Sequence, residues 1–190
     1  MKENQLDIFS TPIWNFFLDE HGQQAIDYCD HILASSLTEP SMNKSNLGGW
    51  QSRDNLHQTE PLLHNLVLSL NKMSNDALGD AVFKPVCITE MWANVNGKYC
   101  SNLAHIHSGI LSGVLYLQVP KGSGRLILRN PAVRSDAHFI RSGNYVIEPE
   151  TLVCVIFPSW LEHYVEPNLS DAMRISLSFN IGVDRSNTHS

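Results

Sequence analysis

The segment RISLSFNIG, residues 174–182, carries the strongest secondary-structure signal in the chain, because its polar and apolar side chains alternate without a break. Successive side chains of a β-strand point to opposite faces, so this strand has one wholly polar face and one wholly apolar face. The apolar face is expected to pack against a second layer, and the polar face then looks at water or into a polar cavity. The polar positions are Arg174, Ser176, Ser178 and Asn180.

Further short segments of strand-like composition lie between residue 84 and this strand, separated by glycine and proline. Their spacing is typical of a β-sandwich or barrel. They span residues 86–95, 113–119, 125–128, 144–147, 152–157 and 163–165.

The first 83 residues predict helices and loops instead. Apolar residues recur at helical spacing over residues 24–33, and a second helix is predicted from Thr59, a capping residue, through Pro61 to Met73. A run of helices followed by strands indicates a mainly β, α+β fold. The polar stretch 41–55 contains Trp50 in a glycine-rich run, which suits either a lid over a pocket or a plain connection.

Length and charge limit the function classes. A chain of 190 residues, 43% of them hydrophobic, suits one domain, with a helical part over 1–83, a strand core over 84–183 and a tail over 184–190. A net charge of −6 disfavours binding to duplex nucleic acid or anionic membranes, which needs clustered Lys and Arg. No long apolar run predicts a membrane span, and the four cysteines form no CxxC pair, so we expect a cytoplasmic protein with reduced thiols.

Three histidines are candidate metal ligands. His105 and His107 flank one residue, and in an extended segment residues two apart share a face, so both imidazoles can reach one ion. His163 is a third candidate in a short strand-like segment. Each signal is weak alone, because nine histidines make a chance HxH common and a lone histidine is more often a packed one.

Arg174 strengthens the metal-site interpretation. It and His163 lie symmetrically about the turn-like stretch 168–172, and a hairpin centred there would place them opposite each other on one face. The guanidinium would then bind a carboxylate through two charge-assisted hydrogen bonds beside the metal. A molecule that chelates a metal at one end and carries a carboxylate at the other, such as 2-oxoglutarate, would span both groups. The alternative for Arg174 is a surface charge.

Two long runs resemble the 2-oxoglutarate- and Fe(II)-dependent oxygenase superfamily. They are NLAHIHSGILSGVLYLQVPKGSGRLILRNP, residues 102–131, and PSWLEHYVEPNLSDAMRISLSFN, residues 158–180. They are most similar to a bacterial and phage branch with an HxH motif. GGWQS at 48–52 and DIFSTPIW at 7–14 extend the resemblance over nearly the whole chain. The resemblance implies a double-stranded β-helix, a cupin-like jelly roll, with the N-terminal helices packed outside.

The resemblance also implies a set of site residues. The superfamily's HxD or HxE motif maps to His105 and His107, the distal ligand to His163, and the co-substrate arginine to Arg174. Fe(II) is then the cofactor and 2-oxoglutarate the co-substrate. Ser176 is expected near the same carboxylate as Arg174. Three more residues are expected to line the pocket: Tyr116, Asn94 and Asn102.

His107 departs from the superfamily pattern, which has a carboxylate there. Three histidines can still bind iron on one face, and the change removes one negative charge from the metal site. If His107 points away, two histidines and another group hold the metal. Glu90 and Glu162 also offer carboxylates, but Glu162 neighbours His163 and should face the opposite side of the strand.

The expected reaction is a hydroxylase-type oxidation of a small-molecule or peptide substrate, giving succinate and carbon dioxide. Two alternatives stay open: a three-histidine iron dioxygenase that does not use 2-oxoglutarate, and a non-catalytic jelly-roll binding module. The sequence does not fix the oligomeric state, with a homodimer among the options.

Overall fold

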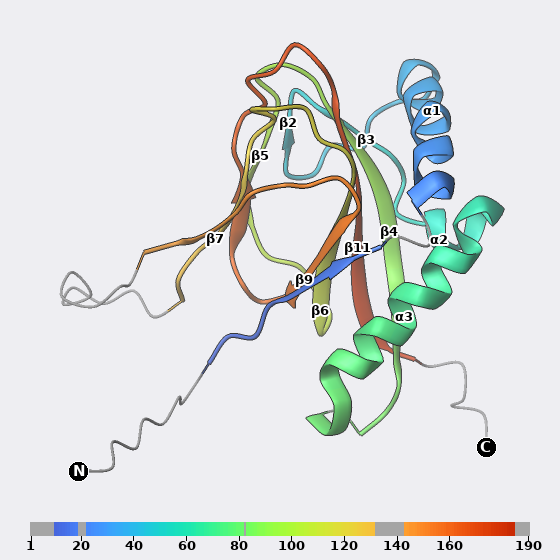
Figure 1. Ribbon diagram of the computed structural model, residues 1–190, viewed down its shortest axis with the longest axis vertical. Helices are drawn as coiled ribbons and strands as arrows, with labels where there is room; N and C mark the ends of the chain where they lie inside the picture. The colour runs from blue at the N-terminus through green and yellow to red at the C-terminus, as the bar shows by residue number, and fades with distance from the viewer. Residues whose placement is uncertain (1–9, 19–21, 82, 132–142, 185–190) are drawn as a thin grey trace.

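Two antiparallel β-sheets face each other in the computed structural model, and the helices lie outside them (Figure 1). The structure describes residues 10–18, 22–81, 83–131 and 143–184. The expected mainly β architecture is confirmed. It is a double-stranded β-helix, because strands from distant parts of the chain alternate between the two sheets.

The larger sheet has six strands in the order β1-β9-β6-β11-β4-β3. Its central pair, β11 with β4, is the longest, and β11 also pairs with β6. In that order the strands are Trp14–Phe17, Val153–Pro158, Leu111–Gln118, Arg174–Val183, Val86–Asn96 and Trp50–Gln51.

The smaller sheet has five strands in the order β2-β5-β10-β7-β8. These strands are short, and they form the second wall of the barrel. In that order they are Asn46–Leu47, Ser101–His105, His163–Val165, Leu126–Leu128 and Tyr145–Ile147.

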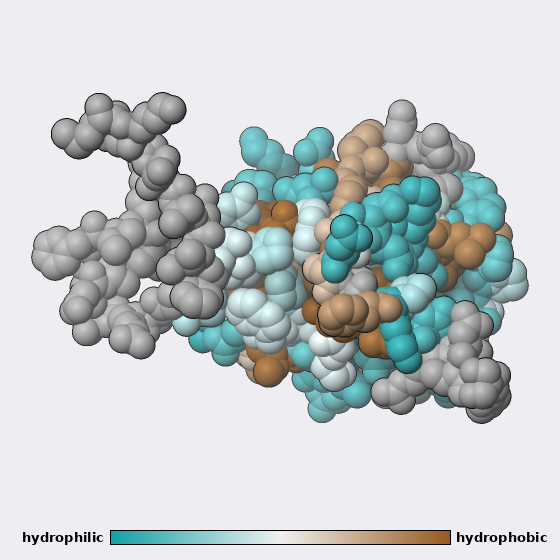
Figure 2. Space-filling model, turned by 90° about the horizontal axis from the view of Figure 1, so that it is seen from below, coloured by the Kyte–Doolittle hydropathy of each residue, from teal (hydrophilic) through white to brown (hydrophobic). Residues whose placement is uncertain are grey.

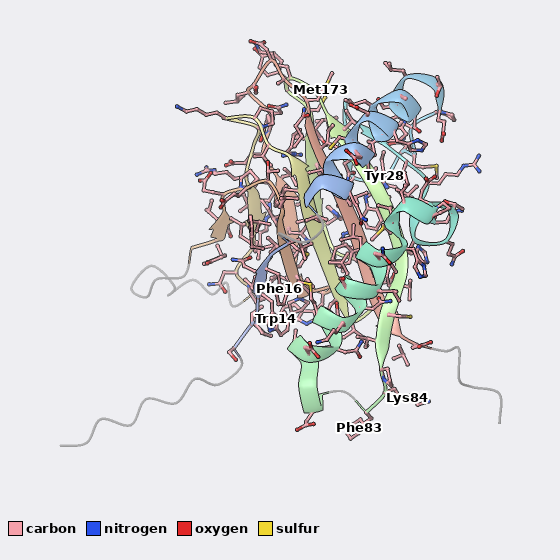
Figure 3. The ribbon with its side chains drawn as sticks, turned by 45° about the vertical axis from the view of Figure 1, so that its right-hand side comes forward. Trp14, Phe16, Tyr28, Phe83, Lys84 and Met173 are labelled. Carbon is pink, nitrogen blue, oxygen red and sulfur yellow. The ribbon has the colours of Figure 1, made fainter. Side chains whose placement is uncertain are left out.

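The helices cover the outer face of the larger sheet (Figure 1). α1 (Gly22–Thr38) and α3 (His64–Leu78) bury Tyr28 and Leu70 against its outward side chains, in one apolar cluster that includes Phe179 of β11. Tyr28 is labelled on α1 in Figure 3. Burying this face accounts for the apolar half of the β11 alternation. The shorter helices are α2 (Leu56–Thr59), η1 (Pro61–Leu63) and η2 (Gly79–Ala81).

The end of the molecule where β4 begins carries hydrophilic residues interspersed with separate hydrophobic patches (Figure 2). Within the described part of the chain, no helix combines the length and the apolar character that a membrane crossing requires. The four cysteines are free, as expected.

Sequence reasoning placed most strands but missed β1, β2, β3 and β5. β2 and β3 have two residues each, and β5 is mostly polar, so none of the three has an alternation long enough to detect. The second predicted helix is divided into η1 and α3, which begins at His64. The prediction that Thr59 caps it is wrong, because Thr59 is the last residue of α2.

The hairpin predicted between His163 and Arg174 is wrong. β10, which starts at His163, pairs with β5 and β7 of the smaller sheet, whereas β11, which starts at Arg174, pairs with β4 and β6 of the larger one. Asn168 holds the connection that crosses between the two sheets. The buried Asn168 amide donates hydrogen bonds to the carbonyls of Asn96 and Ala172, each at 2.9 Å.

Candidate metal centre

Three histidines converge inside the barrel. His105 ends β5, His163 begins β10, and the two are directly paired across these neighbouring strands. His107 follows β5 by two residues. One ring nitrogen from each of the three lies within 4.8 Å of the others, so a single ion can contact all of them.

Backbone hydrogen bonds orient two of the rings. Nδ1 of His105 is 2.6 Å from the Leu103 carbonyl oxygen, and Nδ1 of His163 is 2.9 Å from the Leu161 carbonyl oxygen. With Nδ1 protonated and donating, Nε2 of each ring keeps its lone pair for a metal. The ring of His107 has no hydrogen-bond partner among the described residues and packs at 5.6 Å, centroid to centroid, from Trp92.

Burial keeps these imidazoles neutral. Loss of water contact, together with the two neighbouring histidines, lowers the pKa of His107 to about 3. Burial likewise lowers the pKa of His163 to about 4 and lowers the pKa of His105. Neutral imidazole is the form that binds metals, so the three groups present lone pairs that protons do not occupy at neutral pH.

The polar face of β11 looks into the barrel, which settles the choice left open between water and a cavity. Each polar residue of β11 opposes an inward residue of β4. The opposed pairs are Arg174 with Asn96, Ser176 with Asn94, Ser178 with Trp92, and Asn180 with Glu90.

Arg174 is a buried cation in this interior. Its side chain is 2% exposed, and its Nη1 donates to the carbonyls of Ser123 at 2.9 Å and Gly124 at 3.3 Å. No carboxylate of the described residues forms an ion pair with it. Burial lowers the pKa of the guanidinium, and an uncompensated buried charge is costly, so the site favours an anionic ligand. The surface-charge alternative for Arg174 is therefore wrong.

All the predicted site residues lie around one cavity. The three histidines, Arg174, Ser176, Tyr116, Asn94 and Asn102 line it together. Asn94 Nδ2 donates to Ser178 Oγ at 3.1 Å, and Asn102 Nδ2 donates to Ser45 Oγ at 3.3 Å. Burial raises the pKa of Tyr116 to about 12, so its hydroxyl stays protonated and can donate a hydrogen bond.

Trp50 is not a lid over this cavity. In the β3–β4 register Trp50 opposes Val95, on the helix side of the sheet, and its ring nitrogen donates to the Glu39 carbonyl at 3.1 Å. Trp50 is instead packed against the apolar cluster beneath the helices. The next residue, Gln51, opposes Asn94 and therefore faces the cavity side.

Sequence reasoning missed two neighbours of the metal centre. Ser45 Oγ lies 3.4 Å from His105 Nε2, in a loop without any sequence signal. Trp92 packs on His107, and here the signal existed: Glu90, Trp92 and Asn94 alternate with apolar residues along the segment predicted as a strand.

Comparisons with known proteins agree with this geometry. Residues 90–180 match a family model described as "Putative 2OG-Fe(II) oxygenase". A search of curated protein sequences gave no match.

Several solved structures share the fold. A Pseudomonas putida prolyl-4-hydroxylase is 16% identical, with a TM-score of 0.66 over 90% of this chain and 93% of its own. A Trichoplax adhaerens prolyl hydroxylase in complex with a peptide fragment is 15% identical, with a TM-score of 0.64 over 89% and 81%. The epimerase SnoN in complex with Fe3+, alpha ketoglutarate and nogalamycin RO is 12% identical, with a TM-score of 0.70 over 94% and 87%.

The barrel and its three-imidazole cluster define a jelly-roll protein with a candidate metal centre. The chain matches this family, the 2-oxoglutarate- and Fe(II)-dependent oxygenases, over residues 90–180. It is an oxidoreductase whose cofactor is Fe(II) and whose co-substrate is 2-oxoglutarate.

Proposed function

We propose that this protein is a dioxygenase that oxidises a C–H bond of its substrate while converting 2-oxoglutarate and oxygen to succinate and carbon dioxide. One observation carries the proposal: the buried guanidinium of Arg174 has no carboxylate partner in the described structure and lines the same cavity as the three histidines. A ligand with a metal-chelating end and a carboxylate end satisfies both groups at once.

His105, His107 and His163 hold the metal in this proposal. Their donor set fits iron, because imidazole is a ligand that iron accepts and because all three rings are held neutral. When bound, the iron supplies the oxygen activation that side chains cannot perform. The protein contributes the orientation of the rings, through the Leu103 and Leu161 carbonyls, and a cavity that limits water.

Arg174 binds the distal carboxylate of 2-oxoglutarate. The Ser123 and Gly124 carbonyls hold one guanidinium nitrogen, which leaves the other donors of the fork for a ligand. Ser176 opposes Tyr116 across the β11–β6 pairing, which supports a role for both hydroxyls as donors to the same carboxylate. Asn94 and Asn102 line the same cavity.

The prime substrate is a small molecule or a peptide. Two neighbours of the same fold support this range, since one is complexed with a peptide fragment and the other with nogalamycin RO. The acidic charge balance argues against duplex nucleic acid. The single-domain organisation, the cytoplasmic location and a homodimer stay predictions, and sedimentation of the purified protein would test the last of these.

Replacing Arg174 by alanine tests the co-substrate role. We expect Arg174→Ala to abolish 2-oxoglutarate-dependent oxygen uptake while the protein still binds one iron per chain. Arg129→Ala, which removes an exposed arginine paired with Glu162, is the matched control and should keep both properties.

Two experimental outcomes would contradict the proposal and favour one of the two alternative functions. Undiminished oxygen uptake in Arg174→Ala would favour a three-histidine dioxygenase that takes its substrate directly on the metal. Absence of stoichiometric iron in wild-type protein prepared without oxygen would favour a non-catalytic binding module.

A further inference from the structure

A second cavity adjoins the metal centre on the side away from Arg174. It shares His105, His107 and Trp92 with the metal cavity, and it is about 420 Å³ in volume. Glu90 of β4 and Asn180 of β11 are opposed to each other and line this second cavity. They lie six residues along their strands from the opposed pair Asn96 and Arg174, which is roughly 20 Å at about 3.3 Å per residue. We call this second cavity the vestibule.

A buried polar chain positions Glu90 in the vestibule. Asn180 Nδ2 donates to Glu90 Oε2, and Asn180 Oδ1 accepts a hydrogen bond of 2.9 Å from Ser112 Oγ. Ser112 Oγ in turn lies 2.9 Å from Ser159 Oγ. Asn180, Ser112 and Ser159 are all buried, so the amide orientation is fixed and the Glu90 carboxylate is held in one place.

Gln51 supplies a second polar group that lacks a partner. Its side chain is 5% exposed and lines the vestibule, yet its amide makes no hydrogen bond to any residue that the structure describes. Its amide is not sealed off in the core but faces the cavity, so a ligand or water there can hydrogen-bond to it. Gln51 belongs to the GGWQS run, whose role the metal site leaves unexplained.

The charges of the vestibule favour a cation. Glu90, which is partly buried, lines it together with two exposed charges of opposite sign, Asp54 and Lys44. Glu90 forms no ion pair within the described parts of the chain. Trp92 forms the wall shared with the metal centre, and an indole face attracts cations.

We propose that the vestibule is the prime-substrate site and that it selects a substrate bearing an ammonium or guanidinium group. Glu90 accepts the charge-assisted hydrogen bonds of that group, and the Gln51 amide binds a polar group beside it. This assignment rests on the proposed function, because the metal centre forms the inner wall of the vestibule and determines which substrate carbon is oxidised.

The test measures binding without turnover. Calorimetric titrations use protein loaded with Ni(II) and 2-oxoglutarate. The probes are two matched pairs with blocked α-amino and α-carboxyl groups, so that each pair differs in the side-chain cation: Nα-acetyl-L-arginine amide with Nα-acetyl-L-citrulline amide, and Nα-acetyl-L-lysine amide with Nα-acetyl-L-norleucine amide. The proteins compared are the wild type, Glu90→Gln, Gln51→Met and the control Glu150→Gln. Glu150 is an exposed carboxylate that does not line the vestibule, so this control makes the same charge change elsewhere.

We expect at least one cationic probe to bind wild type and Glu150→Gln about tenfold more tightly than its neutral partner, the gain of one charge-assisted hydrogen bond. Glu90→Gln should remove that preference, whereas Gln51→Met should weaken both members of the pair. Equal binding of the two partners, no binding of either cationic probe, or an unchanged preference in Glu90→Gln overturns the assignment.

A separate titration keeps this proposal distinct from the proposed function. Protein loaded with Ni(II) alone is titrated with 2-oxoglutarate in the absence of any probe. Failure of that titration contradicts the proposed function, and the probe titrations, repeated with Ni(II) alone, still decide the charge preference of the vestibule.

Discussion

Acidifying the metal-free protein from about pH 7 to about pH 5 is expected to lower its free energy of unfolding by roughly 3 kcal/mol. Burial lowers the pKa of His107 to about 3 and that of His163 to about 4, from the ordinary value of 6.5. In this range the unfolded chain therefore binds protons that the folded chain does not. Stability is fully present above pH 6.5 and is lost as the pH falls from there toward about 4.

The magnitude follows from these two groups. Each contributes up to about 1.4 kcal/mol for every pH unit below 6.5, or about 2 kcal/mol at pH 5. His163 is 5% exposed and takes the full value, whereas His107 is only partly buried and its share is halved for solvent screening. A loss of roughly 3 kcal/mol is a large part of the 5–15 kcal/mol typical of a domain.

Urea unfolding of metal-free protein at several pH values measures this slope. The His163→Asn variant cannot titrate at that position, so its stability should depend less steeply on pH than that of the wild type, whatever its absolute stability. A free energy of unfolding that stays level across the interval would refute the view that these imidazoles are buried and neutral.

Three further predictions address the core, the surface and the metal ligands. Gly113→Ala should cost about 1–3 kcal/mol and lower Tm, because its Cβ would meet the Phe179 ring, whereas Gly143→Ala, with open space around it, should change stability by less than about 0.5 kcal/mol. Glu162 neighbours His163, but its ion pair with Arg129 is exposed. Glu162→Gln should therefore change the free energy of unfolding by less than about 1 kcal/mol and leave metal binding intact in a metal titration. His107→Asp should keep one metal per chain by metal analysis. It should also lower the iron reduction potential, because the aspartate adds a negative charge beside the ion. A reduction potential equal to that of the wild type would show that residue 107 is not a ligand.

The sequence predicted the fold where local periodicity is strong. The alternation over β11 gave both a strand and two unlike faces, and the structure buries Ile175 and Phe179 under the helices and turns Ser176 inward. Sequence reasoning failed where a strand is defined by its pairing and not by its composition. β3 has only two residues, Trp50 and Gln51, and is a strand because it pairs with β4.

The sequence predicted which residues line the site, but not how the strands bring them together. The HxH spacing identified His105 and His107, yet His163 joins them through the pairing of β10 with β5, a contact between distant segments that no local pattern encodes. His163 and Arg174 do line one cavity as expected, but they reach it from facing sheets and not from a shared hairpin.

The direction of the Glu162 side chain could be predicted from strand alternation. Glu162 neighbours His163, and alternation placed it on the opposite face. In the structure Glu162 pairs at the surface with Arg129 at 2.8 Å, away from the metal centre, as expected. The polar chain that positions Glu90 could not be predicted in the same way, because it joins Asn180, Ser112 and Ser159 from three separate segments.

A crystal structure of protein grown without oxygen in the presence of Fe(II) and 2-oxoglutarate tests the metal and co-substrate roles together. We expect one iron within about 2.0–2.3 Å of a nitrogen from each of His105, His107 and His163, and a carboxylate of 2-oxoglutarate within hydrogen-bond distance of Arg174. Iron bound without these imidazoles, or a co-substrate that leaves Arg174 without a carboxylate, would contradict the account.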